Sequence, residues 1–299
     1  MASEELQKVL ELIASRPALE GTPTLEQMRA NMESHAFPAT EAATVTPVDA
    51  KGVAGEWVVV TESDPKRRVL YFHGGGYVFG SPLTHRRLCE DIARAGRCAV
   101  LNLNFRLAPE HPFPAAVEDA IAGLKFIQAN GPDGGGEAES TFVAGDSAGG
   151  GLTLAALLAA RDQGIDQPRA AIAISAWTDL AITGESVTSL ADDDPQKSSV
   201  PMLEDLARQY LGNADAHEPL ASPLYADLSG LPPLLLQVGG PEMLLSDTTR
   251  AAERARAAGV EVVEEVWDEM FHVWHLYAPM LPEGQEAIER IGEFIRQHA

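Results

Sequence analysis

The sequence predicts an α/β fold in which a mostly parallel central sheet is flanked by helices on both faces and carries a helical cap. After about residue 45, short apolar runs typical of buried strands alternate with longer segments of helical periodicity. Parallel strands need helical crossovers, so this alternation predicts a sheet covered on both faces. Residues 1–44 and 185–215 lack the alternation, and both are expected to form the cap over the carboxyl edge of the sheet.

The expected elements follow from these patterns. Strands are expected where apolar or alternating runs are short, at residues 55–61, 69–72, 99–103, 141–144, 170–175, 234–238 and 262–266. Helices are expected where apolar residues recur at helical spacing, at residues 115–129, 148–161, 247–258 and 285–297. Residues 133–136 are rich in glycine and predict a surface loop. The predicted organisation is an N-terminal helical cap over residues 1–44, a core over residues 45–184 and 216–299, and a second cap segment over residues 185–215.

Composition excludes several classes of protein. The chain has 44 acidic and 22 basic residues, and this net charge of −22 makes nucleic acid an unexpected partner. No apolar run approaches the length of a membrane span, and the N-terminal residues lack the pattern of a secretory signal. A cytoplasmic protein without membrane association is expected. Cys89 and Cys98 predict two buried thiols rather than a disulfide, and no pattern resembles a zinc cluster.

The segment 145–149 has the pattern G-x-S-x-G, with Ser147 at its centre. An apolar strand precedes it and a long helix follows it, which is the context this motif requires. The tight turn between them lifts the serine hydroxyl out of the sheet, and the flanking glycines leave room for a strained backbone. Ser147 is therefore the predicted nucleophile of an α/β-hydrolase elbow.

A glycine-rich loop, His73-Gly74-Gly75-Gly76, follows directly on the strand expected at 69–72. Attack of a serine on an ester places negative charge on the carbonyl oxygen, and backbone N–H groups must point at that oxygen. Gly74 and Gly75 are the predicted donors, with the N–H of Ala148 as the third. His73 precedes the nucleophile, so a structural role in fixing the loop is expected for its ring.

The general base is expected downstream of the nucleophile. His298 lies at the C-terminus and His217 lies in a polar stretch near the second cap segment. His272 and His275 remain, in a loop just past the last expected strand.

The acidic partner is expected in the loop after residues 234–238, where Glu242 and Asp247 are the candidates. Asp247 also has a structural explanation, because it lies where a helix cap or first-turn acid would lie. Glu242 lies nearer the strand end and has no such explanation.

Three segments together resemble the bacterial hormone-sensitive-lipase family of esterases, also called family IV, within the α/β-hydrolase superfamily. They are HGGG at 73–76, GDSAGG at 145–150 and FRLAPEHPFPAA at 105–116, the last with Phe105 where the family has tyrosine. The resemblance covers most of the chain from about residue 69 to its end.

The resemblance also implies how the triad is completed. His272 begins a His-Val-Trp triplet that matches the family's H-G-F, which favours it over His275. Glu242 precedes it by 30 residues and occupies the place of the family's aspartate in D-P-L-x-D, with Met243 in place of proline. The implied triad is Ser147, Glu242 and His272.

The implied activity is hydrolysis of short-chain acyl esters by a serine carboxylesterase through a covalent acyl-enzyme. The resemblance implies a small-molecule ester substrate, no metal or other cofactor, an N-terminal cap, and a homodimer formed through the last strand. An amidase or deacetylase using the same triad is the alternative. A non-catalytic ligand-binding protein is a further alternative, because some receptors that resemble this family have lost the histidine and bind a ligand under the cap. The presence of Ser147, Glu242 and His272 together argues against it.

Overall fold

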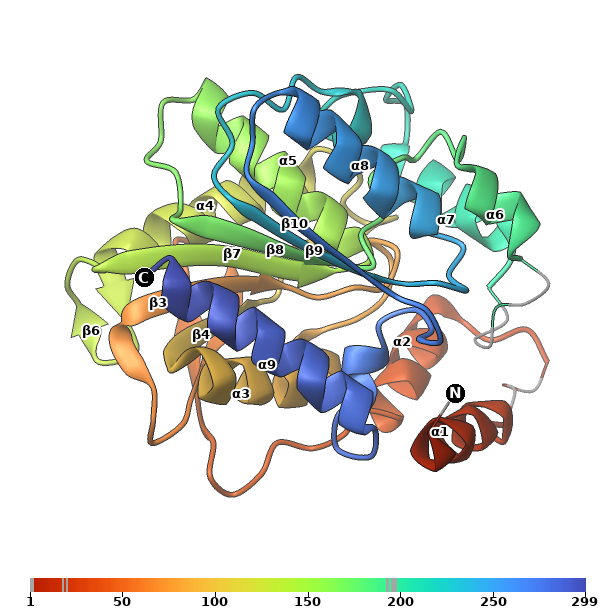
Figure 1. Cartoon of the computed structure of the whole chain (residues 1–299), viewed down its shortest axis with the longest axis horizontal. Helices are drawn as coiled ribbons and strands as arrows, with labels where there is room; N and C mark the ends of the chain where they lie inside the picture. Colours follow the sequence, from red (N-terminus) through yellow and green to blue (C-terminus); the bar gives the residue numbers. More distant parts are fainter. Residues whose placement is uncertain (1–2, 18, 20, 192–193, 195–197) are drawn as a thin grey trace.

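The computed structural model describes residues 3–17, 19, 21–191, 194 and 198–299, and its centre is an eight-stranded sheet (Figure 1). In chain order its strands are β1 (Thr44–Asp49), β2 (Ala54–Val59), β3 (Asp64–Phe72), β4 (Cys98–Leu103), β7 (Ser140–Asp146), β8 (Ala170–Ile174), β9 (Leu234–Gly239) and β10 (Val262–Trp267). Their order across the sheet is β1-β2-β4-β3-β7-β8-β9-β10. Within this sheet the β1–β2 and β2–β4 pairings are antiparallel and the other five are parallel, which confirms the predicted mostly parallel sheet.

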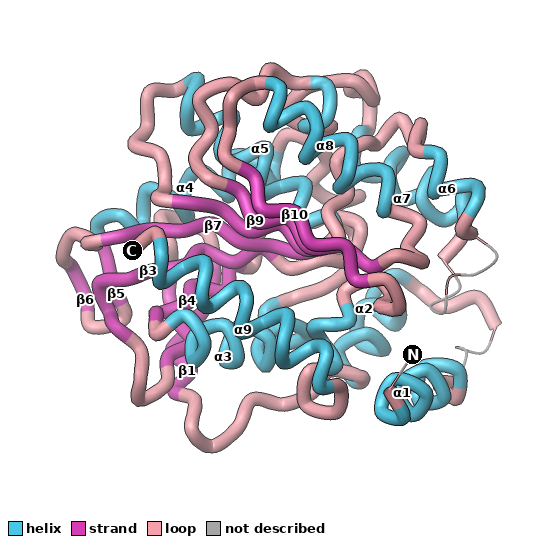
Figure 2. The backbone as a smooth tube through the Cα atoms, viewed as in Figure 1, coloured by secondary structure: helices cyan, strands magenta, loops and turns pink. Residues whose placement is uncertain are grey.

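Helices cover both faces of this sheet, as Figure 2 shows. The major helices of the core are α3 (Pro82–Gly96), α4 (Ala115–Ala129), α5 (Ala148–Asp162), α8 (Leu245–Ala257) and α9 (Pro282–Gln297). The central strand β3 shows why two layers form. Its Leu70 and Phe72 belong to one apolar cluster with α4 and α5, whereas Val69 and Tyr71 belong to another with α3 and α9. All four side chains are fully buried, so both faces of the strand need a cover.

Four further helices lie on the right-hand side of the molecule in Figure 1. They are α1 (Glu4–Ala14), α2 (Leu25–Ser34), α6 (Glu185–Ser189) and α7 (Val200–Leu211). They come from the two segments expected to form the cap. Residues 1–2, 18, 20, 192–193 and 195–197 of these segments lie outside the described residues.

Some elements were not expected from the sequence. Helix α3 was missed because two buried polar side chains, His85 and Glu90, interrupt its apolar stripe. Strand β1 was missed because most of its side chains are exposed or half-buried, so it lacks an apolar run. The predicted loop at 133–136 contains part of a small hairpin, β5 (Asn130–Gly131) with β6 (Gly134–Gly135). Two short 3₁₀ helices, η1 (Pro223–Tyr225) and η2 (Trp274–Tyr277), complete the described structure.

The two cysteines are buried free thiols, as predicted. Among the described residues, no helix has both the length and the apolar character needed to cross a membrane.

Candidate active site

Ser147 occupies the sharp turn between β7 and α5, with φ 53° and ψ −120°. Its N–H donates to the Ile174 carbonyl at 2.8 Å, and its own carbonyl accepts from the Trp177 N–H at 2.9 Å. A Cβ on Gly149 would lie 2.0 Å from the Phe72 carbonyl oxygen, so only glycine fits where the elbow crosses β3. The strained serine conformation is therefore held by close packing of backbone on backbone.

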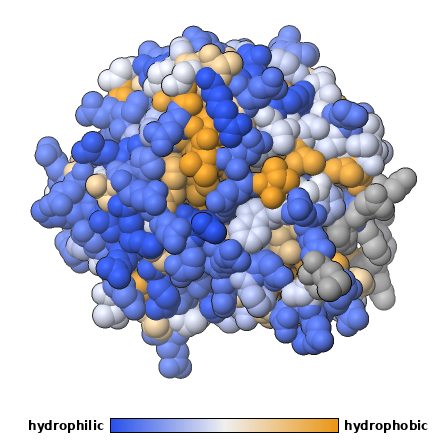
Figure 3. Space-filling view, in the orientation of Figure 1, coloured by the Kyte–Doolittle hydropathy of each residue, from blue (hydrophilic) through white to orange (hydrophobic). Residues whose placement is uncertain are grey.

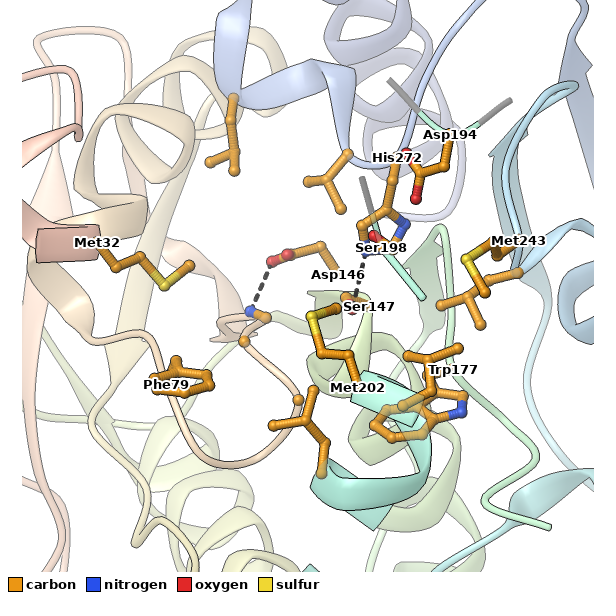
Figure 4. Close-up of a pocket in the computed structure, with 18 of the residues that line it drawn as sticks. Met32, Phe79, Asp146, Ser147, Trp177, Asp194, Ser198, Met202, Met243 and His272 are labelled. Atoms are coloured by element: carbon orange, nitrogen blue, oxygen red, sulfur yellow. Dashed lines mark hydrogen bonds between the residues drawn. The ribbon is translucent and has the colours of Figure 1, made fainter. Parts of the chain in front are cut away.

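His272 lies in the loop after β10, and its ring faces Ser147 (Figure 4). Its Nε2 lies 3.0 Å from Ser147 Oγ, and its Nδ1 lies 2.8 Å from Glu242 Oε2. A carboxylate can only accept, so Nδ1 carries the proton and Nε2 accepts from the serine hydroxyl. The structure thus brings Ser147, His272 and Glu242 into one hydrogen-bonded chain.

Glu242 follows β9 and is 1 % exposed. Its other oxygen, Oε1, accepts from the Gly239 N–H and from Ser175 Oγ, each at 2.7 Å. Ser175 Oγ in turn accepts from the Val273 N–H, beside His272, at 3.2 Å. These contacts fix the carboxylate and the histidine loop relative to each other. Sequence reasoning missed Ser175, whose only signal was its place at the end of an expected strand.

The alternative candidates have structural partners elsewhere. Asp247 lies in the first turn of α8, and its Oδ2 accepts from the N–H groups of Thr178 and Asp179, each at 2.9 Å. Burial and the neighbouring Asp179 raise the pKa of Asp247 to about 7. His275 is buried and its Nε2 lies 2.8 Å from Gln237 Oε1. Neither contact involves the serine.

The other two histidines downstream of Ser147 have partners elsewhere or lie at the end of the chain. His217 is exposed and pairs with Asp215, and His298 follows the last helix, α9.

Two opposing effects act on the pKa of His272. Burial lowers this pKa, while the hydrogen bond and negative charge of Glu242 raise it. Together with the charges of Asp194 and Asp146, Glu242 outweighs burial, so the pKa of His272 lies above its ordinary value. Glu242 therefore stabilises the imidazolium that would form when the histidine takes the serine proton.

The glycine-rich loop departs from the sequence prediction at one position. The Gly74 N–H donates to Asp146 Oδ1 at 3.1 Å, so this N–H is directed at a carboxylate and not at a substrate oxygen. Its predicted role as an oxyanion donor does not agree with this geometry. Gly74, Gly75 and Gly76 all line the same cavity as Ser147, and Ala148 begins α5. His73 has the expected structural role, because its Nδ1–H donates to the Gly74 carbonyl at 2.9 Å.

Asp146 is the centre of a buried polar cluster beneath this loop, which sequence reasoning did not find. Tyr71 donates its hydroxyl to Oδ1 at 2.7 Å, and His85 Nε2 lies 3.2 Å from Oδ2. Burial raises the pKa of Asp146, but the charge and hydrogen bond of His85 and the hydrogen bond of Tyr71 bring it below its ordinary value. Asp146, the residue directly before the nucleophile, therefore joins the glycine loop to the elbow.

Comparison with known proteins agrees with this geometry. A family model described as the alpha/beta hydrolase fold matches residues 69–276. The chain belongs to the α/β hydrolases. It is 47 % identical over 241 residues to an acetyl-hydrolase of Streptomyces hygroscopicus, covering 81 % of this chain and 79 % of the relative. It is 30 % identical over 272 residues to an esterase of Acinetobacter venetianus, covering 91 % and 86 %.

The solved structures indicate which family of α/β hydrolases the chain belongs to. An esterase from the bacterial hormone-sensitive lipase family matches with a TM-score of 0.93 and 44 % identity, covering 100 % of this chain and 99 % of that one. The resemblance expected from the three motifs is confirmed, and this α/β hydrolase is a hormone-sensitive-lipase-like esterase. It is a carboxylic ester hydrolase, so the ligand-binding alternative is wrong.

The cavity of this esterase lies directly over the nucleophile and has a volume of about 260 Å³. Helix α2 contributes Met32, and α7 contributes Met202, Leu203 and Leu206. Figure 4 shows Met32 and Met202 pointing into it from two different elements. Both segments expected to form the cap therefore supply walls of the cavity. Among the described residues of this esterase, no cluster of three or more His, Cys, Asp or Glu side chains could hold a metal ion.

Proposed function

We propose that this esterase hydrolyses short-chain acyl esters through a Ser147–His272–Glu242 triad and a covalent acyl-enzyme. The observation that carries the proposal is the unbroken chain of contacts from Ser147 Oγ through the imidazole to the Glu242 carboxylate. The small cavity above Ser147, walled by methionine, leucine and tryptophan side chains, supports a short acyl group.

The reaction has two steps. His272 Nε2 takes the proton of Ser147 as Oγ attacks the ester carbonyl, and the same proton then passes to the alcohol as the C–O bond breaks. Water, activated by His272, next attacks the acyl-enzyme and releases the acid. The N–H groups of Gly75, Gly76 and Ala148 stabilise the oxyanion in both steps, in place of the Gly74 donor expected from the sequence. No metal or other cofactor is needed for these steps. The segments 1–44 and 185–215 act as a cap whose side chains limit the length of the acyl chain.

The test compares wild type with Ser147→Ala on p-nitrophenyl esters from acetate to decanoate. We expect the variant to lose about 10⁴-fold or more in kcat. We also expect kcat/KM of the wild type to peak at the shortest chains. Equal rates for the two proteins would exclude the triad, and a maximum at decanoate would exclude short-chain preference.

A second candidate substrate is an acetyl group on oxygen or nitrogen, and it is favoured by the 47 % identical relative named acetyl-hydrolase. Comparing p-nitrophenyl acetate with p-nitroacetanilide separates ester from amide cleavage. Amide turnover that Ser147→Ala abolishes would support the deacetylase alternative.

We further propose that the esterase forms a homodimer through β10. This strand is the last in the sheet and exposes Val263 and Val266, and Figure 3 shows apolar surface in its region on a largely hydrophilic face. An unpaired strand edge beside apolar side chains is a ready template for a second copy. The cytoplasmic location stays a prediction.

A further inference from the structure

A second cavity, of about 80 Å³, adjoins the cavity over Ser147. Three side chains, Met32, His85 and Leu276, line both cavities. The two spaces are therefore separated by no more than one layer of side chains. Met32 is a flexible part of this layer, since an unbranched thioether adapts its shape easily.

The second cavity is lined by basic side chains in a strongly acidic protein. Arg16, His35, His85 and Arg87 face it, and no Asp or Glu occurs among the described residues that line it. The chain as a whole has twice as many acidic residues as basic ones, 44 against 22. The described lining thus holds basic side chains and no acidic ones, which is the reverse of the composition of the chain.

The arginines retain donors for a ligand. The Arg16 guanidinium lies 5.6 Å from the centre of the Tyr277 ring, and no carboxylate among the described residues forms an ion pair with it. Arg87 uses its Nε to bind Asp91, at 3.0 and 3.1 Å, which leaves its two terminal nitrogens. The carboxylate of Asp146, which lies behind His85, is already bound by its own cluster.

A carboxylate with one or two carbons fits this volume and donor set, because guanidinium groups bind carboxylates through paired hydrogen bonds. The leaving alcohol must lie on the side of His272, which returns the proton to it. Leu276, in η2, lies one turn beyond His272 and forms part of the shared wall.

We propose that the second cavity binds an anionic group carried by the alcohol part of the substrate. The natural substrates would then be acyl esters of hydroxy acids, and this inference rests on the proposed function.

The test uses two substrates of nearly equal shape, 4-acetoxybutanoate and 4-acetoxybutanamide, with release of acetate as the readout. Wild type should favour the carboxylate by about tenfold in kcat/KM, mainly through KM, as expected for a charged hydrogen bond. Because the molecule is acidic, long-range repulsion alone would favour the amide.

Substitutions of the two arginines test whether the preference for the carboxylate substrate arises in the second cavity. Arg16→Gln should bring the ratio of the two kcat/KM values close to one, and Arg16→Lys should retain part of it. Arg87→Gln combined with Asp91→Asn should also reduce the ratio without changing the net charge. Arg290→Gln is the matched control, since it removes one positive charge from the exposed side of α9, where Arg290 is 52 % exposed. Its ratio should equal that of wild type.

Three results would overturn the inference: no preference for the carboxylate in wild type, a preference that survives in both variants, or an equal loss in Arg290→Gln. Failure of the proposed function is a different result, since hydrolysis of 4-acetoxybutanamide would then persist in Ser147→Ala.

Discussion

The backbone N–H of Gly74 and the carboxylate of Asp146 are joined by a hydrogen bond of 3.1 Å beneath the nucleophile. Gly74 belongs to the loop that precedes α3, and Asp146 is the last residue of β7. The bond therefore ties the glycine loop to the nucleophile elbow, across two strands that are neighbours in the sheet.

Removal of this carboxylate should destabilise the protein strongly. Asp146→Ala leaves the Tyr71 hydroxyl, the Gly74 N–H and His85 without their buried acceptor. We expect the free energy of unfolding to fall by about 3–5 kcal/mol, as for other broken buried ionic networks. Urea denaturation measures this change. Asp146→Asn keeps one carbonyl oxygen as an acceptor, so its free energy of unfolding should fall clearly less. Equal decreases in the two variants would argue against the network.

The pH dependence of kcat/KM should follow His272. The imidazole acts as a base only when neutral, and Glu242 raises its pKa above the ordinary 6.5. Activity should therefore fall as the pH decreases through a midpoint above about 6.5. In Glu242→Gln the charge is lost while burial remains, so the midpoint should move to lower pH and kcat should fall by about 10⁴-fold. A pH–rate profile of both proteins checks this, and an unchanged midpoint in the variant would contradict it.

Substitution of Asp247 should affect kcat far less than substitution of Glu242. Asp247→Asn keeps an oxygen to accept from the Thr178 and Asp179 N–H groups, so its kcat should stay within about threefold of wild type, as for a substitution outside a triad. Steady-state kinetics beside Glu242→Gln makes the comparison. A greater loss in Asp247→Asn than in Glu242→Gln would transfer the role of the acid to Asp247.

Arg29 of α2 should control how firmly this helix is docked. It donates to the carbonyls of Val78 and Ala108, at 2.9 and 3.0 Å, and forms an ion pair with Glu110 at 2.7 Å. We expect Arg29→Met to lower the free energy of unfolding by about 2 kcal/mol and to raise KM, because the neighbouring Met32 lines the cavity. Thermal unfolding and kinetics provide the measurements.

Glu110→Gln is the control for this prediction. It keeps both carbonyl contacts of Arg29, so its loss of stability should be less than half as large. A larger decrease in the free energy of unfolding in Glu110→Gln would show that the ion pair, and not the carbonyl contacts, holds α2 in place.

The β10 edge should set the oligomeric state. Val266 is 43 % exposed on this strand, and a lysine there would add charge to the apolar edge. Sedimentation of the wild type should give a dimer, and Val266→Lys should give a monomer at the same concentration. A monomeric wild type would exclude the proposed interface.

The sequence allowed the fold to be predicted where side-chain patterns repeat regularly. Buried strands such as β8 consist only of apolar residues, and α5 is a run of small and aliphatic residues up to Ala160. Prediction failed where tertiary contacts compensate for an irregular pattern. Helix α3 buries Glu90 because Thr40, fifty residues away, donates to it, and no local pattern reveals that partner.

The candidate site shows the same limit. Ser147, His272 and Glu242 could be named as candidates because each follows a predicted strand and occupies a position of a family motif. Ser175 and the Asp146 cluster could not, since their roles depend on which strands are neighbours in the sheet. The Gly74 assignment failed because a motif identifies a loop but not the direction of each N–H within it.

The position of β10 links activity to an edge of the sheet. His272 follows β10, which within the described part of the chain pairs on one side only, with β9. Local fraying of this edge would carry the imidazole away from Ser147 while the interior strands stay intact. Heat inactivation should therefore begin below the temperature at which the core melts. A second copy paired to β10 would delay it, so the thermal lifetime of activity should depend on protein concentration.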